Sequence, residues 1–156
     1  MINLESSRLQ LRELNIEDST DDYVFWLNNP EINQHLESRF VDHTKEDIQC
    51  FIEEVKHSPS TILFGIFIKK DMRHIGNIKI GPINLNHQIA PIGILIGDKN
   101  EWGNGYASEA IQIVTQFGFD KLNNSLYYLN ILTMTYYIYL ICILLFGVCL
   151  ISFSVQ

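Results

Sequence analysis

With 156 residues, 47% of them hydrophobic and 19% charged, the chain has the size and composition of one globular domain with a substantial core. Its net charge of −7 argues against nucleic-acid partners, which require a basic face. An anionic cofactor is still compatible with this charge, because backbone N–H groups at a helix N-terminus bind phosphate without a lysine.

The three cysteines, Cys50, Cys142 and Cys149, suit neither a disulfide framework nor a zinc site, because no C-x-x-C pair occurs. We therefore predict buried, reduced, inert thiols and no metal. The N-terminal segment lacks the apolar run of a signal peptide, so the sequence predicts a cytoplasmic protein.

The first elements are a strand and two helices. Residues 8–14 alternate polar and apolar side chains, which predicts a half-buried strand. Ser19 is the expected N-cap of a helix that stops at residues 28–30, where Pro follows two asparagines. A second helix is expected to start at Thr44, because Asp47 completes a capping-box-like pair before an apolar stripe.

Three strands, a loop and a helix follow. The strands are expected at 61–69, 73–80 and 88–98, and a polar loop at 100–105 precedes a helix over 106–122. Strands joined by tight turns are antiparallel. The order therefore predicts an α/β domain with a mixed, mainly antiparallel sheet flanked by helices.

The loop before the last helix carries the most informative motif, Trp-Gly-Asn-Gly-Tyr-Ala at residues 102–107. Gly103 and Gly105 permit positive φ and the close approach of a ligand. The N–H groups at the following helix start form a diphosphate site. No Lys-Ser/Thr pair follows, so the motif is not a P-loop, and it follows the last strand instead of the first, so it is not a Rossmann fingerprint.

This segment resembles the cofactor motif of the GNAT superfamily of acyl-CoA N-acyltransferases. Trp102, Gly105 and Ala107 occupy the three fixed places of the family pattern, with Trp102 in place of the usual Gln or Arg. The resemblance covers residues 6 to 122. It is greatest to the branch that contains ribosomal-protein alanine acetyltransferases and amino-sugar acetyltransferases.

The resemblance implies direct transfer of an acetyl group from acetyl-CoA to a primary amine, on an amino sugar or a protein N-terminus. Pantetheine would lie along the strand at 92–96, and a backbone N–H there would polarise the thioester carbonyl. The implied cofactor-binding residues are Ile94, Ile96, Trp102, Gly103, Asn104, Gly105, Tyr106, Ala107 and Ser108.

Catalytic and acceptor-binding residues are less sharply indicated. His87 and Asp98 flank the strand and are candidate general bases, and the alternative is that His87 is a turn residue and Asp98 caps the loop. Glu37, Arg39 and Phe40 lie where the family gathers acceptor contacts. The alternative for Arg39 is a solvated loop charge.

The tail departs from the family pattern. We predict an incomplete GNAT core at 1–122, followed by an apolar tail at 123–156 that contains no charged residue. Residues 126–132 could form the next strand, but the family's later helix and strands are expected to be missing or replaced. A membrane helix at 136–153 and a shifted or truncated reading frame are the two explanations. The alternative function is a catalytically impaired acetyl-CoA-binding remnant or a membrane-tethered pseudoenzyme.

Overall fold

A five-stranded antiparallel sheet organises the residues that the computed structural model describes, 2–84, 86–87 and 89–121. Its strands lie side by side in chain order. They are β1 (Asn3–Glu5), β2 (Leu9–Glu13), β3 (Ile62–Ile68), β4 (Arg73–Ile80) and β5 (Ile92–Ile96).

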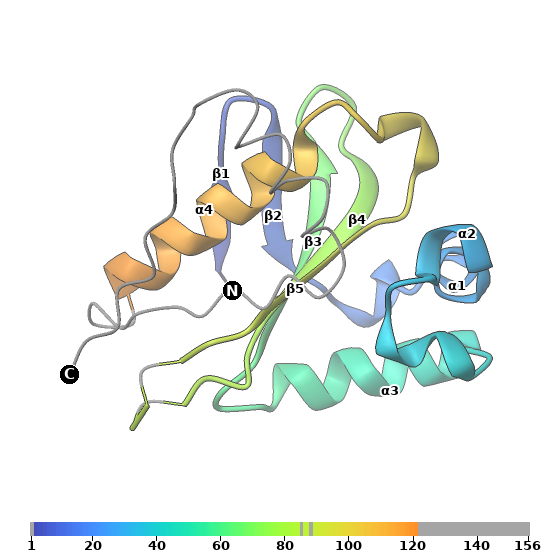
Figure 1. Ribbon diagram of the computed structural model, residues 1–156, viewed down its shortest axis with the longest axis horizontal. Coiled ribbons are helices and arrows are strands. Elements are labelled where there is room, and N and C mark those ends of the chain that lie inside the picture. The colour runs from blue at the N-terminus through green and yellow to red at the C-terminus, as the bar shows by residue number, and fades with distance from the viewer. Residues whose placement is uncertain (1, 85, 88, 122–156) are drawn as a thin grey trace, which may run out of the picture.

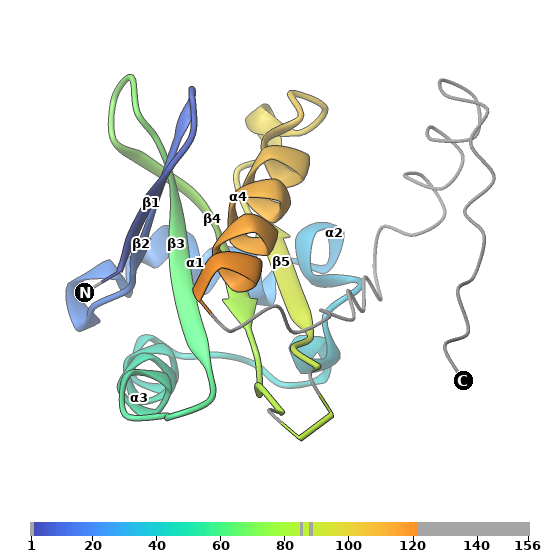
Figure 2. The same ribbon diagram turned by 90° about the vertical axis from the view of Figure 1, so that its left-hand side faces the viewer.

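Helices cover both faces of this sheet (Figures 1 and 2). α4 (Tyr106–Lys121) packs on one face, and α1 (Asp21–Asn28), α2 (Pro30–Asn33) and α3 (Lys45–Lys56) lie on the other. The predicted α/β fold with a mainly antiparallel sheet is therefore confirmed. The expectations for residues 123–156, including the strand at 126–132, lie outside the described residues.

β3 is the central strand, and it is apolar along its whole length because both of its faces are buried. Phe64 and Ile66 belong to the core beneath α4, whereas Leu63 and Phe67 belong to the core beneath α1 and α3. Full burial of one such side chain contributes roughly 2 kcal/mol. The two cores fix which way each side chain of the neighbouring strands points.

A β-bulge interrupts the pairing of β3 with β4. Ile66 pairs with Gly76 and the next residue, Phe67, pairs with His74, so Ile75 is the extra residue. A bulge reverses the inward and outward alternation on the far side of it. His74 therefore lies on the same face of the sheet as Asn77, although residues three apart in a regular strand face opposite ways.

The helix starts confirm one predicted cap and correct another. Thr44 and Asp47 form the predicted capping box. The N-cap of α1 is Thr20, whose hydroxyl accepts from the Tyr23 N–H at 3.3 Å, and the prediction of Ser19 is wrong. Ser19 is buried and donates to the Ile16 carbonyl instead, as the C-cap of the short 3₁₀ helix η1 (Ile16–Asp18).

Other differences arise at the ends of elements. The strand expected at 88–98 spans only Ile92–Ile96, because Pro91 before it has no N–H for the ladder. Residues 28–30 do not end the helical segment, since Asn29 caps a further short helix, α2, that starts at Pro30. β1 was not predicted.

Cys50 is exposed, so the prediction of a buried thiol is wrong at this position. Ile48 and Ile52 turn toward the sheet, and a residue midway between them on a helix points to the opposite side. Cys142 and Cys149 lie outside the described residues. In the described part of the chain no helix is long and apolar enough to cross a membrane, and the tail at 136–153 is not included in that statement.

Candidate functional site

β5 forms one edge of the sheet, and its backbone alternates between β4 and the open side. The Gly81 N–H donates to the Pro91 carbonyl at 2.8 Å, which fixes one hydrogen-bonded pair just before the strand. Such pairs recur at every second residue of an antiparallel ladder, so Leu95 also faces β4. Ile94 and Ile96 therefore direct their N–H and C=O groups away from the sheet.

Trp102 occupies part of this open edge. Its indole Nε1 donates to the Ile96 carbonyl at 2.8 Å, and its side chain remains 43% exposed. Within the described residues, the N–H and C=O of Ile94 and the N–H of Ile96 are left without a partner. An extended ligand with amide groups could bind there as an additional strand.

The loop between β5 and α4 presents further backbone donors. Gly103 and Gly105 have φ of +78° and +80°, a conformation that strongly favours glycine. A Cβ added to Gly103 would meet no atom within 4 Å, so this loop surface is open. The N–H groups of Tyr106 and Ala107 begin a 16-residue helix and have no acceptor in the described part of the chain. Unpaired N–H groups at the positive end of a helix dipole are suited to an anion.

Arg8 holds the α4 side of this loop. Its guanidinium donates to the Asn104 carbonyl at 2.9 Å, pairs with the Glu109 carboxylate at 2.6 Å, and lies 4.5 Å from the centre of the Tyr106 ring. Burial acts to raise the pKa of Glu109, but bonds from Ser6 and Arg8 outweigh it and the pKa is lowered. The start of β2 is thus tied to the start of α4.

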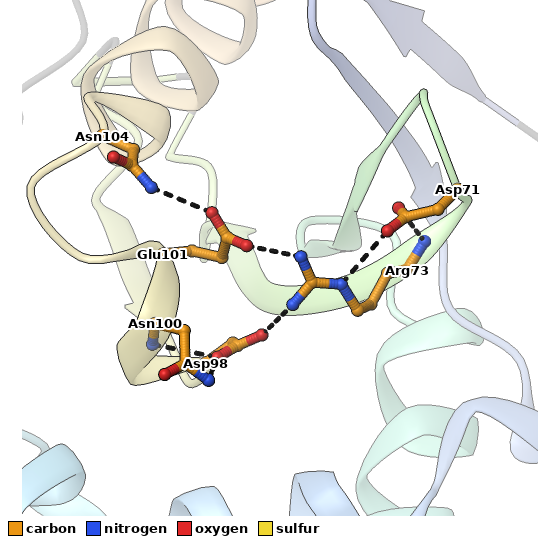
Figure 3. A network of polar contacts seen from close by, with 6 residues as sticks. All are labelled: Asp71, Arg73, Asp98, Asn100, Glu101 and Asn104. Carbon is orange, nitrogen blue, oxygen red and sulfur yellow. Dashed lines mark hydrogen bonds and ion pairs between the residues drawn. The ribbon is translucent and has the colours of Figure 1, made fainter.

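Arg73 holds the β5 side of the same loop (Figure 3). Its guanidinium pairs with the carboxylates of Asp98 and Glu101, and also with Asp71 at 3.3 Å. Glu101 in turn accepts from the Asn104 side chain at 2.9 Å. These bonds connect the start of β4 to the 3₁₀ helix η3 (Lys99–Glu101) and keep the loop in one conformation.

Trp26 fixes the junction where β5 enters this loop. A Cβ added to Gly97 would lie 1.9 Å from the Trp26 ring, so only glycine fits at this position. α1, which carries Trp26, therefore packs directly against the end of β5.

A cleft of about 600 Å³ lies beside β5, on the face covered by α1 and α3. Ile94 lines it, so the cleft reaches the strand position whose backbone faces the open edge. Its polar lining comes from Tyr23, His35, Glu37, Ser38, His43, Asp47, Asn77 and Lys79. The cleft has the size of a small-molecule site.

Aromatic side chains form the wall behind the cleft. His74 stacks on Phe67 with a centroid distance of 4.7 Å and meets the edges of Trp26 and Tyr23 at 5.1 and 6.2 Å. Burial lowers the pKa of His74, although its bonds to Asn77 and Gly76 and the Asp18 charge oppose that effect. Burial also raises the pKa of Tyr23 to about 12. Both groups are therefore neutral at pH 7.

The residues predicted for the cofactor are brought together, whereas those predicted for the acceptor are not all in one place. Residues 94–108 form one continuous edge and loop. Glu37 lines the cleft, but Arg39 and Phe40 do not. They lie within the 3₁₀ helix η2 (Glu37–Phe40), where Arg39 donates to the Leu36 carbonyl at 2.7 Å and lies 4.1 Å from the Phe40 ring centre.

The two candidate bases lie at opposite ends of β5, and neither lines the cleft. His87 is exposed, and its N–H donates to the Asn84 side chain at 3.0 Å, as in a turn. Asp98 caps η3 by accepting from the Asn100 N–H at 3.0 Å and pairs with Arg73.

Asn77, Lys79, Arg8 and Arg73 are among the residues of the site that were not singled out from the sequence. Asn77 and Lys79 line the cleft and alternate with buried Ile78 and Ile80, a period-2 signal that could have placed them on the opposite face. Arg8 and Arg73 gave no local signal, because the groups they bind lie far away in the chain.

Comparisons with known proteins agree on one family. A family model described as an acetyltransferase (GNAT) domain matches residues 8–135. The uncharacterized N-acetyltransferase p20 of Bacillus licheniformis is 30% identical over 125 residues, which are 79% of this chain and 69% of that protein.

Solved structures show the same fold. The GNAT-family acetyltransferase from Bacillus anthracis matches with a TM-score of 0.65 and 18% identity, over 78% of this chain and 68% of that one. The spermidine N-acetyltransferase from Vibrio cholerae, in complex with CoA and spermine, matches with a TM-score of 0.66 and 23% identity, over 76% and 68%. The chain thus spans about two-thirds of the length of these relatives.

Proposed function

The chain belongs to the GNAT family of acetyl-CoA-dependent N-acetyltransferases, and from that membership we propose that the cleft beside β5 receives the amine that is acetylated. The position of Ile94 is the observation that supports this proposal most directly. Its backbone faces the open edge of the sheet, and the residue also lines the cleft. A thioester held along that edge and an amine held in that cleft would therefore meet at one residue.

The residues present fit acetyl-CoA, which supplies the activated acetyl thioester. The unpaired backbone groups of Ile94 and Ile96 suit the amides of pantetheine. The N–H groups from Gly103 to Ser108, with the two positive-φ glycines, suit the diphosphate. Trp102, Asn104, Tyr106 and Ala107 complete the proposed cofactor-binding set.

An N–H at the open edge would also stabilise the oxyanion that forms on the thioester carbonyl, because it is already oriented before reaction. The Ile94 N–H is our candidate for this role. Because the two reactants are held against one strand, much of the acceleration would come from proximity, and a covalent enzyme intermediate is not needed.

The attacking amine must also lose a proton. His87 and Asp98 remain our proposals for the general base, and since neither lines the cleft, each would act through water. His87→Ala and Asp98→Asn separate this role from a structural one. A true base shifts the pH dependence of kcat, whereas a loop cap changes acetyl-CoA binding.

For the acceptor we propose an amino sugar or a protein N-terminus, with Glu37, Arg39 and Phe40 as acceptor-binding residues. The Vibrio cholerae enzyme that shares the fold acts on spermidine, so a polyamine is a third acceptor to compare. The cleft has room for any of these amines.

The experiment combines binding and turnover. Calorimetry should show that the protein binds acetyl-CoA and does not bind ATP. In a separate turnover assay, free CoA should be released from acetyl-CoA when glucosamine, an alanyl peptide or spermidine is added. Binding without turnover of any amine would favour an impaired acetyl-CoA-binding remnant. Binding of ATP in preference to acetyl-CoA would contradict the proposed cofactor.

A further inference from the structure

Asn77 is a buried amide with an unused donor. Its side chain is 5% exposed, and its Nδ2 has no hydrogen-bond partner in the described part of the chain. Buried polar groups are nearly always hydrogen-bonded, because a buried donor without an acceptor is destabilising. Nδ2 has almost no accessible surface, but Asn77 lines the cleft, so a ligand that displaces the groups around the amide could supply the missing acceptor.

His74 fixes which end of the Asn77 amide is the donor. The Nε2 atom of His74 lies 2.9 Å from the Gly76 carbonyl and 2.9 Å from Asn77 Oδ1. A carbonyl only accepts, so Nε2 carries the hydrogen and the Asn77 atom beside it is the oxygen. Nδ2 is then left unpaired and cannot exchange places with Oδ1.

The β-bulge at Ile75 makes this contact possible. It places His74 and Asn77 on the same face, three residues apart, where a regular strand would separate them. Gly76 completes the arrangement, because a Cβ there would lie 2.1 Å from the Leu95 carbonyl. The strand is thus irregular at the one place where it positions this amide.

Asn77 also lies close to the point where the two substrates are proposed to meet. It pairs with Leu95 of β5, the neighbour of Ile94. Directly opposed residues in a sheet have Cβ atoms about 5 Å apart. A group bound to Asn77 Nδ2 would therefore belong to the part of the acceptor next to the reacting amine.

We propose that Asn77 Nδ2 determines acceptor specificity by donating a hydrogen bond to an oxygen atom of the acceptor beside its amine. This inference rests on the proposed function. Amino sugars carry a hydroxyl there and peptide N-termini carry a carbonyl, and both oxygens accept hydrogen bonds. Polyamines carry only protonated amines at neutral pH, which donate and cannot pair with Nδ2.

The experiment uses pairs of amines in which only one member carries oxygen beside the amine. Glucosamine is compared with cyclohexylamine, alaninamide with isopropylamine, and spermidine is tested separately. We measure the calorimetric affinity of each amine for the CoA-bound protein and kcat/KM for its acetylation. Because the oxygen-bearing amines have lower pKa values, each constant is expressed per concentration of neutral amine. On that basis the parent should prefer the oxygen-bearing member of at least one pair by tenfold or more, and the pair that shows it identifies the acceptor as sugar or peptide.

Asn77→Asp is the matched variant, because it keeps an oxygen for His74 and replaces the Nδ2 donor with an acceptor. It should lose the tenfold preference and gain affinity for spermidine, with acetyl-CoA affinity unchanged. His74→Phe keeps a ring on Phe67 and frees the amide, so it should reduce the preference partially, through KM and not kcat.

The outcomes separate the two proposals. The role of Asn77 is overturned if the parent binds both members of every pair with equal affinity. It is also overturned if Asn77→Asp lowers the affinity for both members of a pair equally. Selective binding that depends on Asn77, without acetylation of any amine, supports the role of Asn77 and overturns the proposed function. If Asn77→Asp does not fold, the parent and His74→Phe still give the comparison.

Discussion

The two sides of β5 are built in different ways. On the open edge and the following loop, the proposed cofactor site consists of backbone groups shaped by Gly103 and Gly105. On the cleft side, the proposed acceptor site consists of side chains such as Asn77 and Lys79. A site made of backbone depends on a few glycines, whereas a site made of side chains depends on which residues the fold brings together.

The two sides also differ in how they are held. The loop is held by ion pairs of Arg8 and Arg73, whose side chains are 45% and 43% exposed. On the cleft side, Asn77 is held by a partly buried hydrogen bond from His74. Exposed ion pairs are weak singly and are screened by salt, whereas a hydrogen bond between two neutral groups is not screened by salt. Substitutions should therefore affect the two sides separately.

The largest expected effect is that of Gly105→Val on the cofactor side. A β-branched residue at φ +80° costs about 1–3 kcal/mol in backbone strain, and this strain would distort the loop that carries the proposed diphosphate site. We expect acetyl-CoA affinity to fall by about tenfold or more, which is about 1.4 kcal/mol in binding free energy. Calorimetry on a variant shown to be folded by circular dichroism measures this. Unchanged affinity would mean that the cofactor binds elsewhere.

The effect of Arg73→Gln should be the next largest, and this effect should also be confined to the cofactor side. Without the guanidinium, Asp98 and Glu101 lose their shared partner and the loop becomes less ordered. We expect the KM for acetyl-CoA to rise about threefold to fivefold, since exposed ion pairs contribute up to about 1 kcal/mol. Raising the salt concentration should weaken acetyl-CoA binding more in the parent than in the variant, which lacks the ion pairs of Arg73. A larger change in the acceptor KM would contradict the division between the sides.

Gly93→Ala tests the acceptor side alone. A Cβ at Gly93 meets no atom within 4 Å, and the residue lines the cleft opposite Lys79. The added methyl group should fit the fold and narrow the cleft, so we expect the acceptor KM to change by about twofold to threefold, below 1 kcal/mol. The midpoint temperature of thermal unfolding should not be lowered, and the affinity for acetyl-CoA should be unchanged. Weaker acetyl-CoA binding would show that the cleft also holds the cofactor.

The smallest effect is a dependence of stability on pH that comes from the cleft side. Burial lowers the pKa of folded His74 below the ordinary value of 6.5. As the pH falls below 6.5, the unfolded chain binds a proton that the folded chain does not, so stability decreases until the folded pKa is reached. The slope is at most about 1.4 kcal/mol per pH unit for one proton.

Urea unfolding of the parent and of His74→Gln between pH 7.5 and 5 measures this slope. The variant should lack the His74 contribution. The nearby Asp18 does not interfere. Burial raises the pKa of its carboxyl, but bonds from Arg12 and Asn15 outweigh this and the pKa lies below 3.8, so its stabilising contribution is lost at lower pH. Equal slopes in both proteins would contradict the assignment.

The difference between the two sides also explains what the sequence predicted. The cofactor side could be predicted because its backbone conformation requires glycine, so Gly103 and Gly105 form a recognisable sequence motif. The strand and helix around them follow from local hydrophobic patterns. The acceptor side was predicted from position in the loop, which placed Glu37 in the cleft but not Arg39 or Phe40. Local patterns gave no sign of the bulge at Ile75, which depends on the pairing of two strands, and the role of Asn77 depends on that bulge.

The contact of Trp26 with Gly97 has a mechanical consequence. Because the ring occupies the place where a Cβ would lie, α1 and the end of β5 are pinned together at that point. α1 therefore cannot shift along the end of β5 without displacing the Trp26 ring. The Pro91 end of β5 lines the same cleft but lies at the far end of the strand from this contact, so Trp26 constrains the two ends of the cleft unequally.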